Sequence, residues 1–201
     1  MLGTGTGVGK TWLTAQLARA LFAAGSTPAA RKPVQSFEPG TGPTDADVLA
    51  AATGEAPADV CPPHRSYGVA MAPPLAAEAL GLAPFTLADL VAELQWPPGA
   101  DVGLVEGVGG PRSPLASDGD NVALAHALAP DTVVLVADAG LGAINAVLLA
   151  VAALPHPTVV FLNRFDPADP VHAGNVDWLT KRSGLQVTTT ADDLVRRLSR
   201  G

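Results

Sequence analysis

The sequence predicts an α/β fold of three layers (α/β/α), in which helices cover both faces of a mostly parallel central sheet. Short apolar runs alternate with segments of helical periodicity, and this alternation favours parallel strands joined by helices. The run at 132–137 is continuous and β-branched, as expected of a strand buried on both faces. With 201 residues, of which 48% are hydrophobic and 15% charged, we expect one folded domain, 1–201.

The expected elements follow from the spacing of apolar residues. Strands are expected at 29–34, 102–106, 132–137 and 158–162, and helices at 12–24, 45–52, 87–94, 121–128, 143–154, 175–183 and 191–199. Thr86, with Asp89 three residues later, is typical of a helix start. Five prolines between positions 57 and 74 predict mostly loop there.

The charge balance and the apolar pattern exclude several function classes. Twelve basic and 19 acidic side chains give a net charge of −7 without a large basic patch, so we expect no nucleic-acid partner. The longest apolar region, 132–154, is interrupted by Asp138, Gly140 and Asn145, so we expect no membrane partner. A single cysteine and no visible signal peptide favour a cytoplasmic location.

The strongest motif is the glycine-rich segment from Gly3 to Thr11, which leads into the first expected helix. Glycines let backbone N–H groups surround phosphate oxygens, and the helix N-terminus adds a favourable dipole. Lys10 would lie near the β- and γ-phosphates, and the Thr11 hydroxyl would bind Mg²⁺. The motif therefore predicts a P-loop NTPase fold with ATP bound by Gly5, Gly7, Val8, Gly9, Lys10 and Thr11.

Further polar residues follow the other expected strands, at the sheet edge where ligands bind in such folds. Lys32 comes at the end of the second strand and can stabilise charge on a transferring phosphoryl group. Glu106 ends another strand, is followed by glycines and suits Mg²⁺. Asp45 and Asp47 are alternative candidates for a second carboxylate ligand.

Taken in order, these motifs resemble the dethiobiotin synthetase family. The phosphate loop has the family's additional residue, and the segments Lys32-Pro33-Val34-Gln35-Ser36 and Val105-Glu106-Gly107, with Gly109-Gly110, match its lysine and acid motifs. Leu141-Gly142-Ala143-Ile144-Asn145 is similar to its helix-start motif, and Asn163 to its adenine-reading asparagine. The matches span about four fifths of the chain, and the segment from about Asp166 matches only weakly.

The resemblance implies a ring-closing reaction. One amine of 7,8-diaminopelargonate (7,8-diaminononanoate) would take up CO₂ as a carbamate, ATP would phosphorylate it, and the second amine would close the ring to dethiobiotin, releasing phosphate. Lys10, Lys32 and Thr6 would be catalytic, and Thr11, Asp45 and Glu106 would hold Mg²⁺. The implied substrate contacts are Thr6, Lys32, Ser36 and Gly109, with Gly142 and Asn145 contributed across a homodimer interface.

Two alternatives remain open from the sequence. Cobyrinic acid amide synthases resemble the first half of the chain, but they carry a glutaminase domain with its own Cys nucleophile. Partition-type ATPases carry a second lysine where this chain has Gly5, although the basic amphipathic segment 191–200 keeps that option open.

The first strand presents a separate difficulty, because only Met1 and Leu2 precede the phosphate loop, whereas the family has about five strand residues there. We therefore expect a missing or shortened first strand. One interpretation is an inactive fragment.

Overall fold

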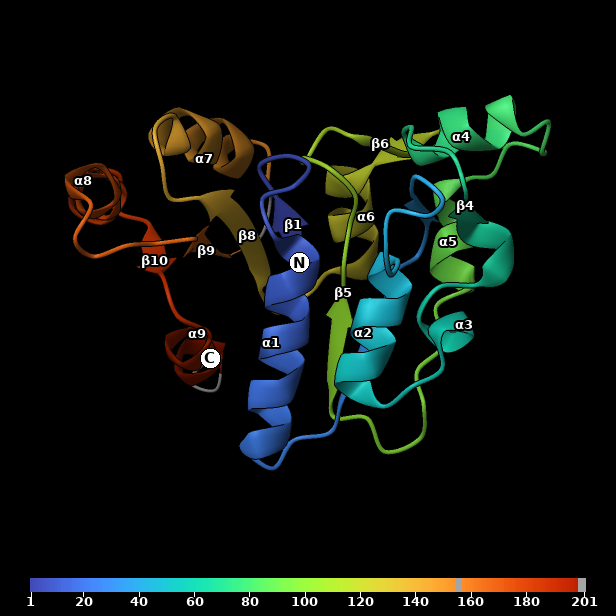
Figure 1. The fold of residues 1–201 in the computed structure, drawn as a ribbon, viewed down its shortest axis with the longest axis horizontal. Helices are drawn as coiled ribbons and strands as arrows, with labels where there is room; N and C mark the ends of the chain where they lie inside the picture. Colours follow the sequence, from blue (N-terminus) through green and yellow to red (C-terminus); the bar gives the residue numbers. More distant parts are fainter. Residues whose placement is uncertain (155–156, 199–201) are drawn as a thin grey trace.

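The computed structural model describes residues 1–154 and 157–198, which form an α/β structure around a parallel sheet (Figure 1). One part of the sheet has the order β1 (Leu2–Gly3), β8 (Val133–Asp138), β9 (Thr158–Asn163) and β10 (Gln186–Thr188). The other part pairs β2 (Pro28–Arg31) with β5 (Val102–Val105), also in parallel. The predicted fold class is confirmed.

Helices cover both faces of this sheet. On one face, α1 (Lys10–Ala23) and α9 (Ala191–Leu198) bury leucines against alternate residues of β8 and β9. On the other face, α7 (Ala143–Ala152) and the π-helical turn η2 (Trp178–Arg182) pack on the intervening residues. None of the helices within the described ranges is long and apolar enough to cross a membrane.

The chain forms further elements besides this sheet and the helices packed on it. The helices are α2 (Asp45–Thr53), α3 (Pro57–Val60), α4 (Pro73–Ala79), α5 (Leu87–Ala92), α6 (Asn121–Leu128), α8 (Pro170–Asp177) and the 3₁₀ turn η1 (Pro63–Arg65). There are also two short strand pairs. In one, β3 (Gln35–Ser36) is parallel to β4 (Ser66–Tyr67), and in the other, β6 (Pro114–Ala116) is antiparallel to β7 (Gly119–Asp120).

Most predicted elements are confirmed within a few residues, including the capping box of Thr86 and Asp89. The strand predicted at 29–34 ends at Arg31, whose carbonyl accepts the Glu106 N–H from β5. The next residue on that side is Pro33, which has no N–H with which to continue the ladder. The Lys32 N–H faces the other side of the strand and donates to the Val60 carbonyl, 2.8 Å away. Lys32 is therefore the first residue after β2, at the carboxyl edge of the sheet where Glu106 follows β5.

Two predictions of local structure are wrong. The segment 57–74 is not mostly loop, because its prolines open α3, η1 and α4, and proline suits the first turn of a helix. The helix predicted at 175–183 begins at Pro170, where the Asp169 carboxylate accepts the Val171 N–H at 2.7 Å. Ser199, the last residue of the helix predicted at 191–199, and Arg200, the last of the basic segment, lie outside the described residues.

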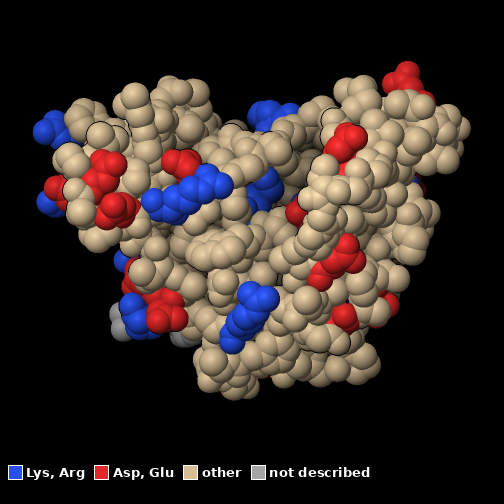
Figure 2. Space-filling view, viewed as in Figure 1, with Lys and Arg blue, Asp and Glu red and all other residues tan. Residues whose placement is uncertain are grey.

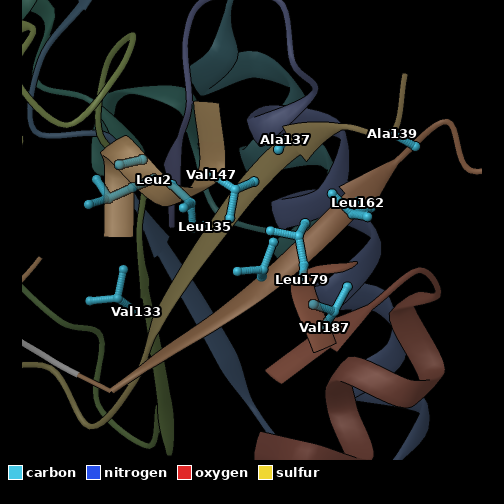
Figure 3. Close-up of a cluster of buried hydrophobic side chains, with 11 residues drawn as sticks. Leu2, Val133, Leu135, Ala137, Ala139, Val147, Leu162, Leu179 and Val187 are labelled. Carbon is cyan, nitrogen blue, oxygen red and sulfur yellow. The ribbon is translucent and has the colours of Figure 1, made fainter. Parts of the chain in front are cut away.

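The first strand is present but short. Leu2 pairs with Leu135 and Gly3 with Val136, and the Leu2 side chain belongs to the buried cluster of Figure 3. Met1 extends the pairing to β5: its nitrogen donates to the Val105 carbonyl at 2.6 Å, and its carbonyl accepts the Gly107 N–H at 3.0 Å. Met1 and β1 therefore join the two parts of the sheet at their carboxyl ends only.

Candidate active site

The phosphate loop connects β1 to α1 and has the backbone shape that its glycines predict. Gly7 and Gly9 have φ of +75° and +97°, a region that favours glycine. A Cβ on Gly9 would also lie 2.0 Å from the side-chain nitrogen of Asn163. The Lys10 ammonium donates to the carbonyls of Gly5, at 3.0 Å, and Gly109, at 3.2 Å, so it bridges the phosphate loop and the glycine segment after β5.

Four polar side chains from four segments meet beside this loop. The Thr11 hydroxyl lies 2.7 Å from an oxygen of Asp45 and 2.8 Å from one of Glu106. The Lys32 ammonium lies 2.6 Å from Asp45 and 2.8 Å from Glu106. Glu106 is fully buried and Lys32 is 1% exposed, whereas the Asp45 side chain faces the cleft. This group is hereafter called the Lys32 cluster.

The charges of the Lys32 cluster determine its protonation. Burial disfavours the Lys32 ammonium, but the carboxylates of Glu106 and Asp45 outweigh burial and raise the pKa of Lys32. Burial likewise disfavours the Asp45 carboxylate, but Lys32 and the Thr11 hydroxyl bring its pKa below the ordinary value. Lys10 differs, because burial and the nearby charge of Lys32 lower its pKa. Lys32 therefore remains a permanent cation, held between two carboxylates.

The Lys32 cluster fits a magnesium ion by the chemistry of its donors. All three candidate ligands offer oxygen, which Mg²⁺ prefers. The Thr11 hydroxyl has one proton but lies within hydrogen-bond distance of two carboxylate oxygens, so its lone pairs and these oxygens converge as a cation would need. No group of three His, Cys, Asp or Glu side chains in the described residues is placed to hold a metal ion, and this candidate site combines two carboxylates with a hydroxyl. Of the two candidate acids, Asp45 lies in the Lys32 cluster, whereas Asp47 caps α2 through Thr44.

A cleft of about 570 Å³ opens over the phosphate loop and the Lys32 cluster. Thr6, Ser36 and Gly109 line it, as expected of substrate contacts, together with Gly7, Gly9, Lys10, Thr11, Lys32 and Asp45. The Ser36 hydroxyl donates to the Met71 carbonyl at 2.5 Å, which ties the segment before α4 to the cleft wall. Figure 2 shows that this face of the molecule is hollowed between its two upper lobes and that its charged side chains are scattered.

The other predicted residues lie beside the cleft or away from it. Gly5 and Val8 present their carbonyls to Lys10 and to Asn163, whose side-chain amide donates to Val8 at 2.9 Å. Gly142 caps α7 and is exposed, as is Asn145, and neither lines the cleft of its own chain. The structure thus brings most of the predicted residues together but leaves these two outside.

Several site residues were missed by sequence reasoning. Trp12 is half-exposed and lines the cleft, and Met71 and Ser113 line it too. The Thr14 hydroxyl lies 2.8 Å from the second oxygen of Glu106. Thr14 is four residues after Lys10, and this helical spacing could have indicated that both share one face of α1.

Asn121 and Arg164 were also missed. Asn121 holds the glycine segment: its oxygen accepts the Val108 N–H at 3.0 Å, and its nitrogen donates to the carbonyls of Val108 and Gly110. A Cβ on Gly107 would lie 2.2 Å from the Asn121 oxygen, which explains that glycine. Arg164 donates to the Gly7 carbonyl at 2.8 Å and pairs with Asp138, whose other oxygen accepts the Gly140 N–H.

The comparisons with known proteins agree with this geometry. A family model described as an AAA domain matches residues 1–190. A protein of Anaeromyxobacter dehalogenans (strain 2CP-C), named ATP-dependent dethiobiotin synthetase BioD, is 35% identical over 97% of this chain and 91% of its own length.

Two further proteins carry the same name. That of Nitrosospira multiformis is 38% identical over 90% of this chain and 81% of its own length. That of Haloferax mediterranei is 34% identical over 94% of this chain and 81% of its own length. With a P-loop family match over most of its length and relatives at this level of identity, the chain belongs to the ATP-dependent dethiobiotin synthetase family and is an ATP-dependent ligase of the biotin biosynthesis type.

Proposed function

We propose that this protein converts 7,8-diaminononanoate, CO₂ and ATP into dethiobiotin, ADP and phosphate. The observation that carries the proposal is the Lys32 cluster at the edge of a phosphate-loop cleft, because it supplies charge for phosphoryl transfer without an activated nucleophile. The names of the relatives support the substrate.

The proposed reaction balances in three steps. One amine attacks CO₂ and loses a proton, which gives a carbamate. A carbamate oxygen attacks the γ-phosphorus of ATP, the bond to ADP breaks, and a carbamic–phosphoric anhydride forms. The second amine attacks the carbamate carbon, the bond from that carbon to the phosphate oxygen breaks, and phosphate leaves with the electron pair. The amine proton passes to the departing phosphate, and the five-membered urea ring closes.

The residues of this chain provide position and charge for these steps. The loop backbone and Lys10 hold the phosphates, and Lys10 exchanges its bonds to the Gly5 and Gly109 carbonyls for phosphate oxygens. Lys32 lies deeper, where its ammonium contacts Asp45, Glu106 and the Gly107 carbonyl, and from there its positive charge would stabilise the oxygens shared between carbamate and phosphate. Thr6, Ser36 and Gly109 line the cleft where the amines would lie, and Asn163 lies beside the loop where adenine would bind.

We propose that Thr11, Asp45 and Glu106 hold Mg²⁺ with ATP. When bound, the ion would neutralise charge on the phosphates. Lys32 balances part of the charge of the two carboxylates beforehand, so the buried Glu106 is never an unpaired anion.

The substrate carboxylate requires a further site, and we propose that a second copy of the chain supplies it. Gly142 and Asn145 open α7, where an anion is favoured by the helix dipole. The surface around them is apolar and exposed: Leu141 is 98% and Leu149 68% exposed. A homodimer would cover these leucines and bring the α7 N-terminus to the partner's cleft. We also propose a cytoplasmic location, because the sequence has a single cysteine and no visible signal peptide.

The site supports neither of the two alternatives, a cobyrinic acid amide synthase or a partition-type ATPase. The last helix does not present its apolar side for a membrane or partner, because Leu194 is buried against α1 and both arginines of its last turn pair with Asp193. The relatives' names point away from cobyrinic acid amide synthases as well as from partition ATPases.

The proposed reaction predicts that phosphate release depends on the diamine. With ATP, Mg²⁺ and bicarbonate present, adding 7,8-diaminononanoate should start phosphate release and produce dethiobiotin in a one-to-one ratio, measured by a phosphate assay and mass spectrometry. ATP hydrolysis at the same rate without the diamine would contradict the proposal. A chain with Lys10→Ala is the control for contaminating ATPases, because it loses the phosphate contact and should be inactive.

Lys32→Ala should separate binding from chemistry. The variant should bind an ATP analogue within about threefold of the wild-type affinity, while turnover falls at least about 10²-fold, because a charge near the transferring group is lost. The unpaired carboxylates should also lower the thermal midpoint, and Mg²⁺ should restore part of it. Lys181→Ala, at an exposed ion pair, is the matched control. Normal turnover with Lys32→Ala would show that Lys32 has been misassigned.

Leu149→Glu should weaken the proposed homodimer, because it places a charge on an exposed apolar surface that the partner would desolvate. Sedimentation should then show monomer at concentrations where the wild type is dimeric, and the KM for the diamine should rise. Leu82→Glu introduces the same charge at a half-exposed leucine elsewhere and should change neither the sedimentation nor the KM for the diamine. A wild-type chain that sediments as a monomer at all concentrations would exclude the dimer.

A further inference from the structure

The phosphate loop is held from outside the cleft by two consecutive residues. The Asn163 side-chain nitrogen donates to the Val8 carbonyl at 2.9 Å, and the Arg164 guanidinium donates to the Gly7 carbonyl at 2.8 Å. Gly7 and Gly9 line the cleft, whereas Asn163 and Arg164 do not. Two neighbouring peptide groups of the loop are therefore fixed by side chains that approach from the far side.

These bonds determine where the N–H groups of the loop point. The peptide bonds of the described ranges are trans, and the C=O and N–H groups of a trans peptide face opposite sides of its plane axis. With the Gly7 carbonyl bound by Arg164, the Val8 N–H is turned away from Arg164 and toward the cleft. In the same way, the bond from Asn163 to the Val8 carbonyl turns the Gly9 N–H toward the cleft. N–H groups in this direction are what a phosphate loop needs in order to bind phosphate oxygens.

Arg164 reaches the loop through an unusual backbone conformation. Its φ is +57°, in the left-handed region, which a residue other than glycine rarely adopts. A residue that continued β9 in extended conformation would direct its side chain to the opposite face from Asn163. The positive φ ends the strand, and both neighbours contact the same loop. Strain of this kind persists only where surrounding contacts hold it, and it is concentrated at functional sites.

Asp138 holds the guanidinium in this position. It is the last residue of β8 and pairs with Asn163 in the ladder. One of its carboxylate oxygens lies 2.7 Å from Arg164, and the other accepts the Gly140 N–H at 2.9 Å. The Gly140 N–H and the Arg164 guanidinium lower the pKa of Asp138, so its carboxylate is charged at neutral pH. The Arg164 guanidinium is thus fixed between a carboxylate and the phosphate loop.

We propose that Arg164 is a positioning residue of the phosphate loop. Held by Asp138, it fixes the Gly7 carbonyl on the outer side and keeps the Val8 N–H directed at the bound phosphates. Arg164 itself contacts neither the phosphates nor the base. Its contribution is preorganisation, because a loop that already has its binding conformation loses less affinity to ordering. This inference rests on ATP binding at the phosphate loop, which is part of the proposed function, and is independent of the diamine and of CO₂.

Two other roles of Arg164 predict different results. If its charge acted on the phosphates directly, Asp138 would oppose it, and removing the Asp138 charge would tighten nucleotide binding. If the guanidinium held the adenine base, its loss would weaken the binding of ATP but not that of tripolyphosphate, which has no base. In the positioning role, both ligands are affected alike, and Asp138 and Arg164 act in the same direction.

The test measures the affinities of a non-hydrolysable ATP analogue and of tripolyphosphate by titration calorimetry, with Mg²⁺ present. Arg164→Ala should weaken the binding of both ligands by the same factor, roughly fivefold or more. Asp138→Asn should also weaken the binding of both. The double variant should bind no more weakly than Arg164→Ala alone, because the two residues act as one unit.

The matched control is Arg196→Ala, which removes the same charge from another exposed Arg–Asp pair, on α9, and should leave both affinities unchanged. All variants should melt within about 3 °C of the wild type, because exposed ion pairs contribute little to stability. If Arg164→Ala does not fold, Arg164→Gly takes its place, since glycine suits the positive φ at this position.

Tighter or unchanged binding in the Asp138 variant would overturn the proposal, as would a loss of affinity confined to the ATP analogue. A wild type that binds neither ligand would overturn the nucleotide site and this inference with it. No turnover is measured, so failure of the diamine reaction alone would leave the result unaffected.

Discussion

The buried contact of Lys32 with Glu106 and Asp45 is the interaction on which the rest of the site depends. Lys32 follows β2, Glu106 follows β5 and Asp45 begins α2, so one ammonium joins three segments at the carboxyl edge of the sheet. Losing one member of a buried ion pair costs about 3–5 kcal/mol, because the remaining charge stays buried without a partner. The Thr11 hydroxyl attaches the phosphate loop to the same carboxylates.

The Lys32 cluster also explains why the site needs no general base with a shifted pKa. Lys32 is held as a cation and Asp45 as an anion over the physiological range, so the charges are fixed before ATP arrives. Phosphoryl transfer depends on such preorganised charge more than on proton transfer by the protein. In the proposed reaction, the substrate itself supplies the nucleophiles.

The sequence predicted the parts of the site that depend on local structure. The phosphate loop, Lys32 and Glu106 could be found because each follows a strand, and the carboxyl ends of parallel strands meet at one edge. Asn121 and Arg164 could not, because each acts through a tertiary contact that no local spacing encodes. Thr14 lies between these cases: its helical spacing from Lys10 indicates the face of α1, but its contact with Glu106 is tertiary. The strand predicted at 29–34 was too long, because Pro33, the next residue after Arg31 that would face β5, has no N–H with which to continue the ladder.

The central claim is that Thr11, Asp45 and Glu106 act as one cation site with Lys32 as its permanent counter-charge. Its most direct test is the affinity for Mn²⁺, as a spectroscopic substitute for Mg²⁺, with a non-hydrolysable ATP analogue bound. Glu106→Gln should weaken Mn²⁺ binding at least about tenfold, because a charged ligand is lost. Asp47→Asn, on the same helix as Asp45 but engaged in its cap, should leave the affinity unchanged. Equal affinities of the wild type and the Glu106 variant would contradict the account.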